Sequence, residues 1–170
     1  MKFSAELRNY LTGNFLNVNK NSIALIIASF LGTGFFPVAS GSFASLIAIV
    51  LFWIIPLANW IWILILVPVF IIGVVASSKV EIDKGKDPKI VVIDEITGQW
   101  VALLFLPRTI PVLIAALFLF RFFDITKLYP ANKMEQLKGG FGIMMDDLVA
   151  GIYTNVVLQI YFILQNSYLS

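Results

Sequence analysis

Five apolar stretches, separated by short polar segments, dominate the chain from residue 43 onward. Each has close to the length of about 17 to 25 residues that a membrane-crossing helix needs. The first is short and is interrupted by Pro56, and the third includes two carboxylates. The pattern therefore predicts candidate transmembrane helices at residues 43–58, 60–77, 90–107, 110–128 and 147–164.

The segment before these stretches has a different pattern. Residues 23–36 are apolar but too short and too broken by glycine for a full span, so we predict a surface-lying or re-entrant segment. Residues 1–20 contain Glu6 and polar breaks, which argues against a cleavable signal peptide. For the segment from about Lys2 to Lys20 we favour an interfacial amphipathic helix over a substrate gate. We expect an all-α integral membrane protein of one domain, 1–170: a compact bundle of four to five transmembrane helices at 43–165, after an interfacial or re-entrant segment at 1–42.

The composition supports a lipid environment and narrows the chemistry. The chain is 59% hydrophobic and 13% charged, with a mean hydropathy of +0.92, whereas soluble domains are about 45 to 50% apolar and about 25% charged. Cys and His are absent, which excludes disulfides, Cys or His zinc sites and Ser-His-Asp triads. The net charge of +2 is too small to indicate a nucleic-acid partner.

The distribution of charge predicts an orientation. Basic residues precede the first stretch and lie between the second and third and between the fourth and fifth, whereas Arg108 alone lies on the other side. By the positive-inside rule, the N-terminus and both charged loops face the cytoplasm. The acidic residues fall on the same side, so three stretches bring carboxylates to one depth near the cytoplasmic interface: Asp94, Glu95, Asp124, Asp146 and Asp147.

The stretch GIMMDDLVAG, residues 142–151, places two adjacent carboxylates at the start of the fifth apolar run. One interpretation is a helix cap, because acidic side chains stabilise a helix N-terminus. However, neighbouring side chains point about 100° apart on a helix, so Asp146 and Asp147 cannot share a face. Ala150 and Gly151, one turn further on, would let another helix approach closely. A functional pair is the alternative to a cap.

The stretch KDPKIVVIDEITGQW, residues 86–100, carries a second acidic pair. Asp94 and Glu95 follow several apolar residues and so lie deeper than a cap requires. Gln99, four residues after Glu95, could share its helix face and hydrogen-bond it. The alternative is a polar helix end exposed among the lipid headgroups.

Two further stretches carry candidate phosphate-binding residues. In FRFFDITKLYP, residues 120–130, Arg121, Asp124 and Lys127 recur every three residues along one side of a helix end. They could neutralise one another, or Arg121 and Lys127 could clamp an anion. In GTGFFPVASGSFASL, residues 32–46, a glycine-rich turn with Thr33 and Ser42 could present backbone N–H groups to an anion, or Ser42 could simply cap the following helix.

Together, clustered carboxylates without His or Cys suit a hard, oxygen-preferring cation such as Mg²⁺. Nearby Arg and Lys complete the usual set of groups for phosphoryl chemistry, and the substrate would reach such a site from the lipid.

These four stretches, in this order and spacing, resemble the bacterial phosphatidylglycerophosphatase A family, and the resemblance runs from about residue 32 to residue 155. It implies a Mg²⁺-dependent, multi-pass phosphatase of the bacterial cytoplasmic membrane, with its site on the cytoplasmic side, that converts phosphatidylglycerophosphate to phosphatidylglycerol. The family's acidic positions correspond here to Asp94, Glu95, Asp124, Asp146 and Asp147, and its basic positions to Arg121 and Lys127. Ser40, Ser42 and Leu128 depart from the family pattern.

Direct hydrolysis is the favoured mechanism, with Mg²⁺ held by some of Glu95, Asp146 and Asp147 and with Asp94 or Asp124 as general base. An aspartyl-phosphate intermediate ranks second. Two other classes remain as alternatives: a lipid alcohol phosphotransferase, and a proton- or cation-coupled transporter that uses the carboxylates. The oligomeric state is left open by the sequence.

Overall fold

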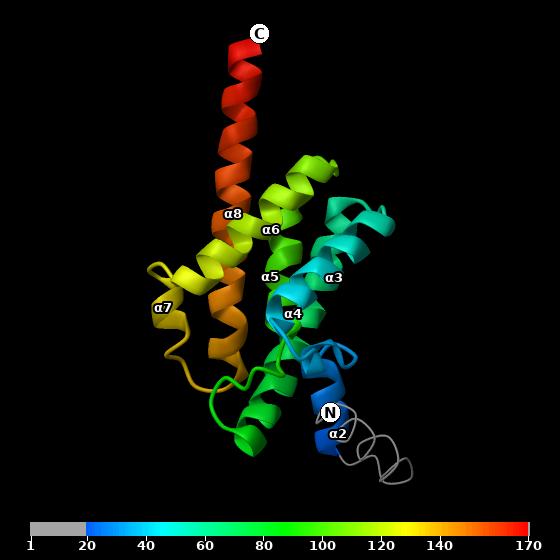
Figure 1. Cartoon of the computed structure of the whole chain (residues 1–170), viewed down its shortest axis with the longest axis vertical. Helices are drawn as coiled ribbons and strands as arrows, with labels where there is room; N and C mark the ends of the chain where they lie inside the picture. The colour runs from blue at the N-terminus through cyan, green and yellow to red at the C-terminus, as the bar shows by residue number, and fades with distance from the viewer. Residues whose placement is uncertain (1–19, 170) are drawn as a thin grey trace.

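The computed structural model describes residues 20–169, and helices are the only regular secondary structure in this range (Figure 1). The predicted all-α class is confirmed. The interfacial helix expected near the N-terminus lies outside the described residues, apart from Lys20. In chain order the elements are α2 (Lys20–Ala28), η1 (Thr33–Phe35), α3 (Ser40–Ile54), α4 (Asn59–Lys84), α5 (Ile93–Leu103), α6 (Ile110–Thr126), α7 (Ala131–Met134) and α8 (Gly140–Leu169).

Two of the described helices are long and apolar enough to cross a membrane: α4, with 26 residues, and α8 from Gly140 to Ser167, with 28. Large apolar side chains on α4 point outward, among them Trp60, 71% exposed, and Leu64, 73% exposed. In water such exposure would be unfavourable, but lipid chains can cover it. The C-terminal end of α8 extends beyond the other helices (Figure 1).

Helix α5 lies at the centre of the bundle and is shorter than predicted. Its 11 residues cover about 16 Å at about 1.5 Å per residue, roughly half of a hydrocarbon core about 30 Å thick. Helices α3 and α6, with 15 and 17 residues, lie against it. The side-chain amide of Asn155 on α8 donates to the carbonyls of Ala102 (3.1 Å) and Leu104 (2.7 Å), so the end of α5 has hydrogen-bond partners.

Two glycines allow α5 and α8 to approach closely. A side chain at Gly98 would collide with the backbone carbonyl of Asp147 and the ring of Phe120, and one at Gly151 would collide with the backbone of Gly98. Small residues at a crossing let helix backbones come into contact. This contact fixes the rotation of α8 relative to α5, and hence the direction in which the carboxylates on α8 point.

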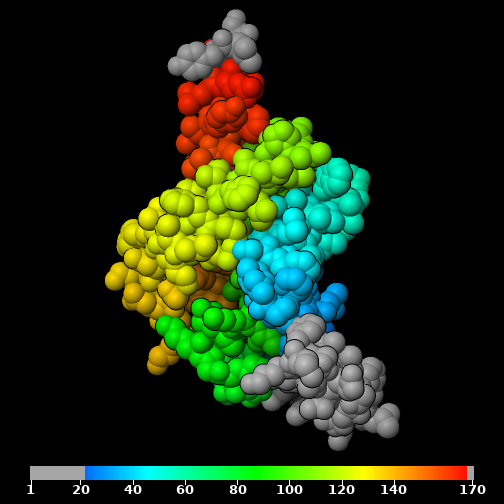
Figure 2. Space-filling model, in the orientation of Figure 1, coloured from blue at the N-terminus to red at the C-terminus, as the bar shows by residue number. Residues whose placement is uncertain are grey.

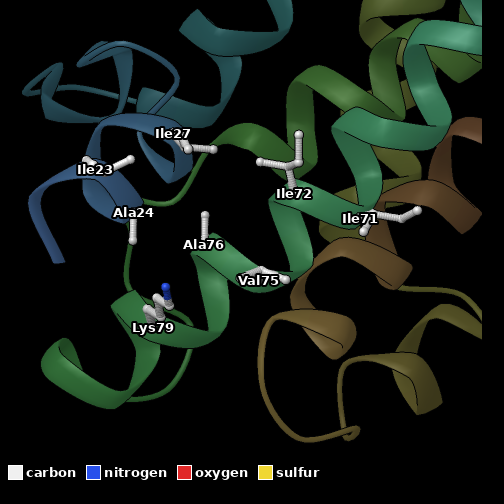
Figure 3. Close-up of a pocket in the computed structure, with 8 residues that line it drawn as sticks. All are labelled: Ile23, Ala24, Ile27, Ile71, Ile72, Val75, Ala76 and Lys79. Carbon is white, nitrogen blue, oxygen red and sulfur yellow. The ribbon is translucent and has the colours of Figure 1, made fainter. Parts of the chain in front are cut away.

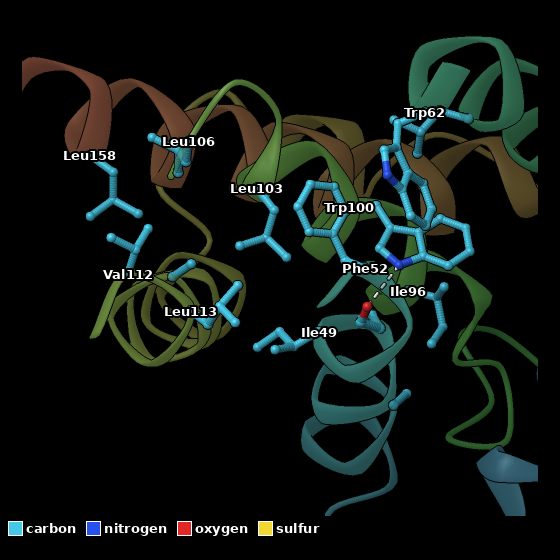
Figure 4. Close-up of a cluster of buried hydrophobic side chains, with 14 of the residues drawn as sticks. Ile49, Phe52, Trp62, Ile96, Trp100, Leu103, Leu106, Val112, Leu113 and Leu158 are labelled. Carbon is cyan, nitrogen blue, oxygen red and sulfur yellow. Dashed lines mark hydrogen bonds between the residues drawn. The ribbon is translucent and has the colours of Figure 1, made fainter. Parts of the chain in front are cut away.

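An aromatic cluster holds α3, α4 and α5 together (Figure 4). The ring of Trp62 lies 4.9 Å from that of Phe52 and 5.0 Å from that of Trp100, centroid to centroid. The indole N–H of Trp100 donates to the Ala48 carbonyl at 2.9 Å. These contacts fix the position of α3 relative to α5 along this part of their length.

On another side of α4, where it packs against α2, the two helices line an apolar groove with a volume of about 280 Å³ (Figure 3). Lys79, at one end, is its only charged lining residue. The groove contains none of the predicted site residues.

Candidate active site

Three carboxylates from two helices meet at the start of α5. Asp94 and Glu95 lie in its first turn, and Asp147 faces them from α8. One oxygen of each lies within 4.8 Å of an oxygen of the other two. Asp94 is 7% exposed and Asp147 is 3% exposed. We call Asp94, Glu95 and Asp147 the carboxylate cluster.

Two oxygens of the carboxylate cluster lack hydrogen-bond partners. Oδ1 of Asp94 and Oε2 of Glu95 are buried and have no hydrogen-bond partner among the described residues. Buried carboxylates without partners are strongly unfavourable unless a proton or a cation neutralises them. Three converging carboxylate oxygens are the ligands that hard divalent cations prefer. The cluster therefore fits a metal ion of this class.

Arg121, near the end of α6, lies beside the cluster. Its Nη1 lies 2.7 Å from Oδ2 of Asp124 and 3.7 Å from Oε1 of Glu95. Its Nε has no hydrogen-bond partner among the described residues. The predicted pairing of Arg121 with Asp124 is thus present, and it orients a guanidinium group whose buried Nε donor has no partner among the described residues.

Asp146 makes a different set of contacts from Asp147. Its Oδ2 accepts a hydrogen bond from Nζ of Lys127 at 2.9 Å, and its Oδ1 accepts one from the backbone N–H of Asp147 at 3.1 Å. Asp146 therefore lies next to the carboxylate cluster and not within it. The metal set expected from the sequence was Glu95, Asp146 and Asp147; the structure places Asp94 with Glu95 and Asp147 instead.

Lys127 connects α6, α8 and the segment after α7. It ends α6 in a left-handed conformation, with φ of 44°, and its Nζ also lies 2.9 Å from Oε1 of Glu135. Burial lowers the pKa of Lys127, but hydrogen bonds to Asp146 and Glu135 outweigh this effect and raise it. Helix α7 packs against the lower half of α8 (Figures 1 and 2), which brings Glu135 to Lys127. Sequence reasoning did not include Glu135 in the site.

The cap interpretation of the aspartate pair is wrong. Helix α8 begins at Gly140, so Asp146 and Asp147 are its seventh and eighth residues and lie beyond the first turn. The helix can begin there because Gly140 packs against the backbone of α4 near Val74 and Ser78, where a side chain would not fit. The pair therefore lies inside a helix and faces other helices.

The glycine-rich loop reaches the site through a residue that the sequence did not single out. A side chain at Gly41, in the first turn of α3, would collide with the Glu95 carboxylate and approach Nη1 of Arg121. Thr33 donates its hydroxyl to the Phe30 carbonyl at 2.7 Å. Ser42 lies within α3, whose N-cap is Ala39, so the alternative interpretation of Ser42 as a helix cap is wrong.

Gln99 also differs from its expected arrangement. It is fully buried, and neither its amide nitrogen nor its amide oxygen has a hydrogen-bond partner among the described residues. The predicted hydrogen bond to Glu95 is therefore not formed.

Gly41→Ala is expected to impair the site while leaving the fold intact. The new methyl group would meet the carboxylate end of the Glu95 side chain and not backbone. A long side chain can change its rotamer, so the melting temperature should change little. Displacement of that carboxylate should lower the kcat/KM of the site by roughly 10-fold or more, as for other misplaced site groups. Gly151→Ala is the matched control, because its methyl group would meet the backbone of Gly98 and should lower the melting temperature instead. Equal loss of stability in both variants would contradict the arrangement of α3.

Comparison with known proteins identifies the family of the chain. The family model described as Phosphatidylglycerophosphatase A matches residues 26–162. A Bacteroides thetaiotaomicron protein named "Putative phosphatidylinositol-3-phosphatase" is 40% identical over 147 residues, covering 81% of this chain and 92% of the relative. Proteins named phosphatidylglycerophosphatase A from Escherichia coli and Haemophilus influenzae are 33% and 35% identical, each over 81% of this chain, with 81% and 87% of their own lengths covered. No solved structure matches the chain. The matched region contains the carboxylate cluster, Arg121 and Lys127, and the chain belongs to the phosphatidylglycerophosphatase A family.

Proposed function

We propose that this lipid phosphatase removes the terminal phosphate of phosphatidylglycerophosphate, giving phosphatidylglycerol and inorganic phosphate, and that it depends on Mg²⁺. The observation that carries the proposal is the carboxylate cluster, with its unpartnered oxygens, directly beside Arg121. Two of the relatives carry the name phosphatidylglycerophosphatase A, which supports this substrate.

In the proposed hydrolysis, different residues bind the metal ion and the phosphate. Asp94, Glu95 and Asp147 would hold the metal ion. When bound, Mg²⁺ polarises the phosphoryl group and offsets the charge that develops on its oxygens. Arg121, oriented by Asp124, binds the phosphoryl oxygens through its free donor, and Lys127 adds a second cation. Water attacks phosphorus and the bond to the glycerol oxygen breaks. A carboxylate takes a proton from the water and then returns it to the departing oxygen.

We further propose that the chain is one membrane-embedded domain with four to five spans, located in the bacterial cytoplasmic membrane. Helices α4 and α8 are long enough to cross alone, whereas α3, α5 and α6 would do so only together with the loops that adjoin them. The excess of Lys and Arg near the site end supports a cytoplasmic active site and a cytoplasmic N-terminus. A phospholipid would then reach the cluster with its headgroup at the interface.

A second substrate has specific support. The Bacteroides relative is 40% identical and is named for phosphatidylinositol-3-phosphatase activity. Phosphatidylglycerophosphate and phosphatidylinositol 3-phosphate both present a phosphate monoester on a polar headgroup. The same carboxylate cluster, with Arg121 and Lys127, could therefore bind the phosphate of either lipid. They differ in the group that carries the monoester, glycerol in one and inositol in the other.

The purified protein in detergent is expected to release phosphate from phosphatidylglycerophosphate. Phosphatidylinositol 3-phosphate is assayed in parallel as the second candidate substrate. EDTA should abolish the release, because the carboxylate cluster would lose its ion, and added Mg²⁺ should restore it. The measurement is inorganic phosphate per unit time for each lipid, with and without EDTA. Faster release from the inositol lipid would reassign the substrate, and release that is insensitive to EDTA would reject the metal-dependent mechanism.

A further inference from the structure

Gln99 is a buried polar residue that the proposed mechanism does not use. Its exposed fraction is 0%, and both polar atoms of its amide lack partners among the described residues. An amide can donate two hydrogen bonds and accept others, so a buried amide without any is unfavourable and requires an explanation. A residue that served only to fill space at this position would not need an amide.

The position of Gln99 relative to the carboxylate cluster follows from the helices. It lies four residues after Glu95 on α5, so the two side chains are neighbours on one helix face. Gly41 of α3 lies against Glu95, and the carbonyl of Ala48 on α3 accepts from Trp100. Gln99 is therefore about one helical turn further from the start of α5 than Glu95, and it is fully buried within the bundle.

The unpartnered groups in this region complement one another chemically. Oε2 of Glu95 is a buried acceptor without a donor, and Nε2 of Gln99 is a buried donor without an acceptor. A carboxylate that binds a metal ion through one oxygen is normally held by a hydrogen bond to the other, which fixes its orientation. Among the side chains of α5, Gln99 alone combines an amide donor with the helix position to supply this bond.

We propose that Gln99 is a positioning residue for Glu95: its amide N–H donates to the Glu95 carboxylate when the cluster holds its cation, and so directs one carboxylate oxygen toward the ion. The inference rests on the proposed metal-dependent function. It assigns Gln99 no contact with the lipid or with the reacting phosphate.

The test compares Mn²⁺ binding by wild type, Gln99→Met and Gln99→Leu, all purified in detergent. Mn²⁺ shares the preference of Mg²⁺ for oxygen ligands and can be followed by electron paramagnetic resonance. Loss of the amide is expected to weaken Mn²⁺ binding by roughly 10- to 100-fold, the usual effect of removing a hydrogen-bond partner of a metal ligand. The melting temperature of the metal-free variants should be unchanged or higher, because an unpartnered buried amide is replaced by an apolar group of similar size.

Thr154→Val is the matched control. Thr154 is fully buried on α8 and donates its hydroxyl to the Ala150 carbonyl of its own helix, so the change removes a buried polar group while keeping the shape of the side chain. It should leave the affinity for Mn²⁺ unchanged. If the folded Gln99 variants bind Mn²⁺ with wild-type affinity, the positioning role of Gln99 is overturned, while the metal-dependent function is not affected. Failure of the wild-type protein itself to bind Mn²⁺ would overturn the metal-dependent function together with this inference.

Discussion

Asp147→Asn is expected to lower kcat for phosphate release on the order of 10³-fold, the scale associated with loss of a principal electrostatic group. Asp147 is the contribution of α8 to the carboxylate cluster, and it is 3% exposed. Asparagine keeps the size of the side chain but removes the charge that would hold the cation, so the affinity for Mg²⁺ should fall together with kcat. The measurement is kcat as a function of Mg²⁺ concentration.

The stability of the same variant separates a lost ligand from a damaged fold. Without metal, the three clustered carboxylates, two of them buried, repel one another. Removing one negative charge relieves this repulsion. Metal-free Asp147→Asn should therefore melt at the same temperature as metal-free wild type or higher. Asp83→Asn, which changes an exposed carboxylate at the end of α4, should leave kcat and the affinity for Mg²⁺ unchanged. An Asp147→Asn protein that is inactive because it melts early would contradict the assignment of Asp147 as a ligand.

Arg121→Lys is expected to lower kcat/KM by roughly 10²-fold, although the positive charge is kept. The guanidinium group lies between Asp124 and Glu95 and still has a donor free. A lysine ammonium group is compact and cannot serve two carboxylates and a phosphate at once. Kinetics with phosphatidylglycerophosphate at saturating Mg²⁺ would measure the loss.

Two further variants test whether Arg121 acts directly on the phosphate. Asp124→Asn removes the group that orients Arg121 but keeps a hydrogen-bond acceptor, so its loss should be smaller, about 10-fold. Lys133→Met removes an exposed positive charge from α7 and should have no effect on kcat/KM. If Asp124→Asn were more damaging than Arg121→Lys, Asp124 would be the residue closer to the reaction.

The gathering of the charged residues could be predicted from the sequence. Charge placement relative to the apolar stretches brought Asp94, Glu95, Asp124, Arg121 and Lys127 to one end of the bundle, and the structure has them there. This succeeds because charged groups cannot lie in hydrocarbon, so the positions open to them in a short apolar chain are few.

The pairing within that group could not be predicted. The helix period shows that Asp146 and Asp147 must point in different directions, but not which of them faces α5. That choice depends on the rotation of α8, which the contact between Gly98 and Gly151 sets. Backbone contacts of this kind link residues far apart in the chain, and no local pattern encodes them.

The ends of the helices could not be predicted from local sequence patterns either. Apolar composition continues past both ends of α5, yet the helix runs only from Ile93 to Leu103. Conversely, α8 begins seven residues before the predicted start, in a stretch whose glycines suggest a loop. In each case packing against another helix, and not the propensity of the residues, decides where the helix begins or ends.

The two hydrogen bonds from Asn155 to the end of α5 bear on how the lipid substrate reaches and leaves the site. In the proposed membrane arrangement this helix end lies within the hydrocarbon, where water cannot solvate its carbonyls, and Asn155 takes the place of water. A helix of half the membrane thickness can then be stable at a fixed depth, with the carboxylate cluster at its other end, level with the phospholipid headgroups. Substrate and product would exchange by lateral diffusion within one leaflet, and neither acyl chain would have to leave the bilayer during a catalytic cycle.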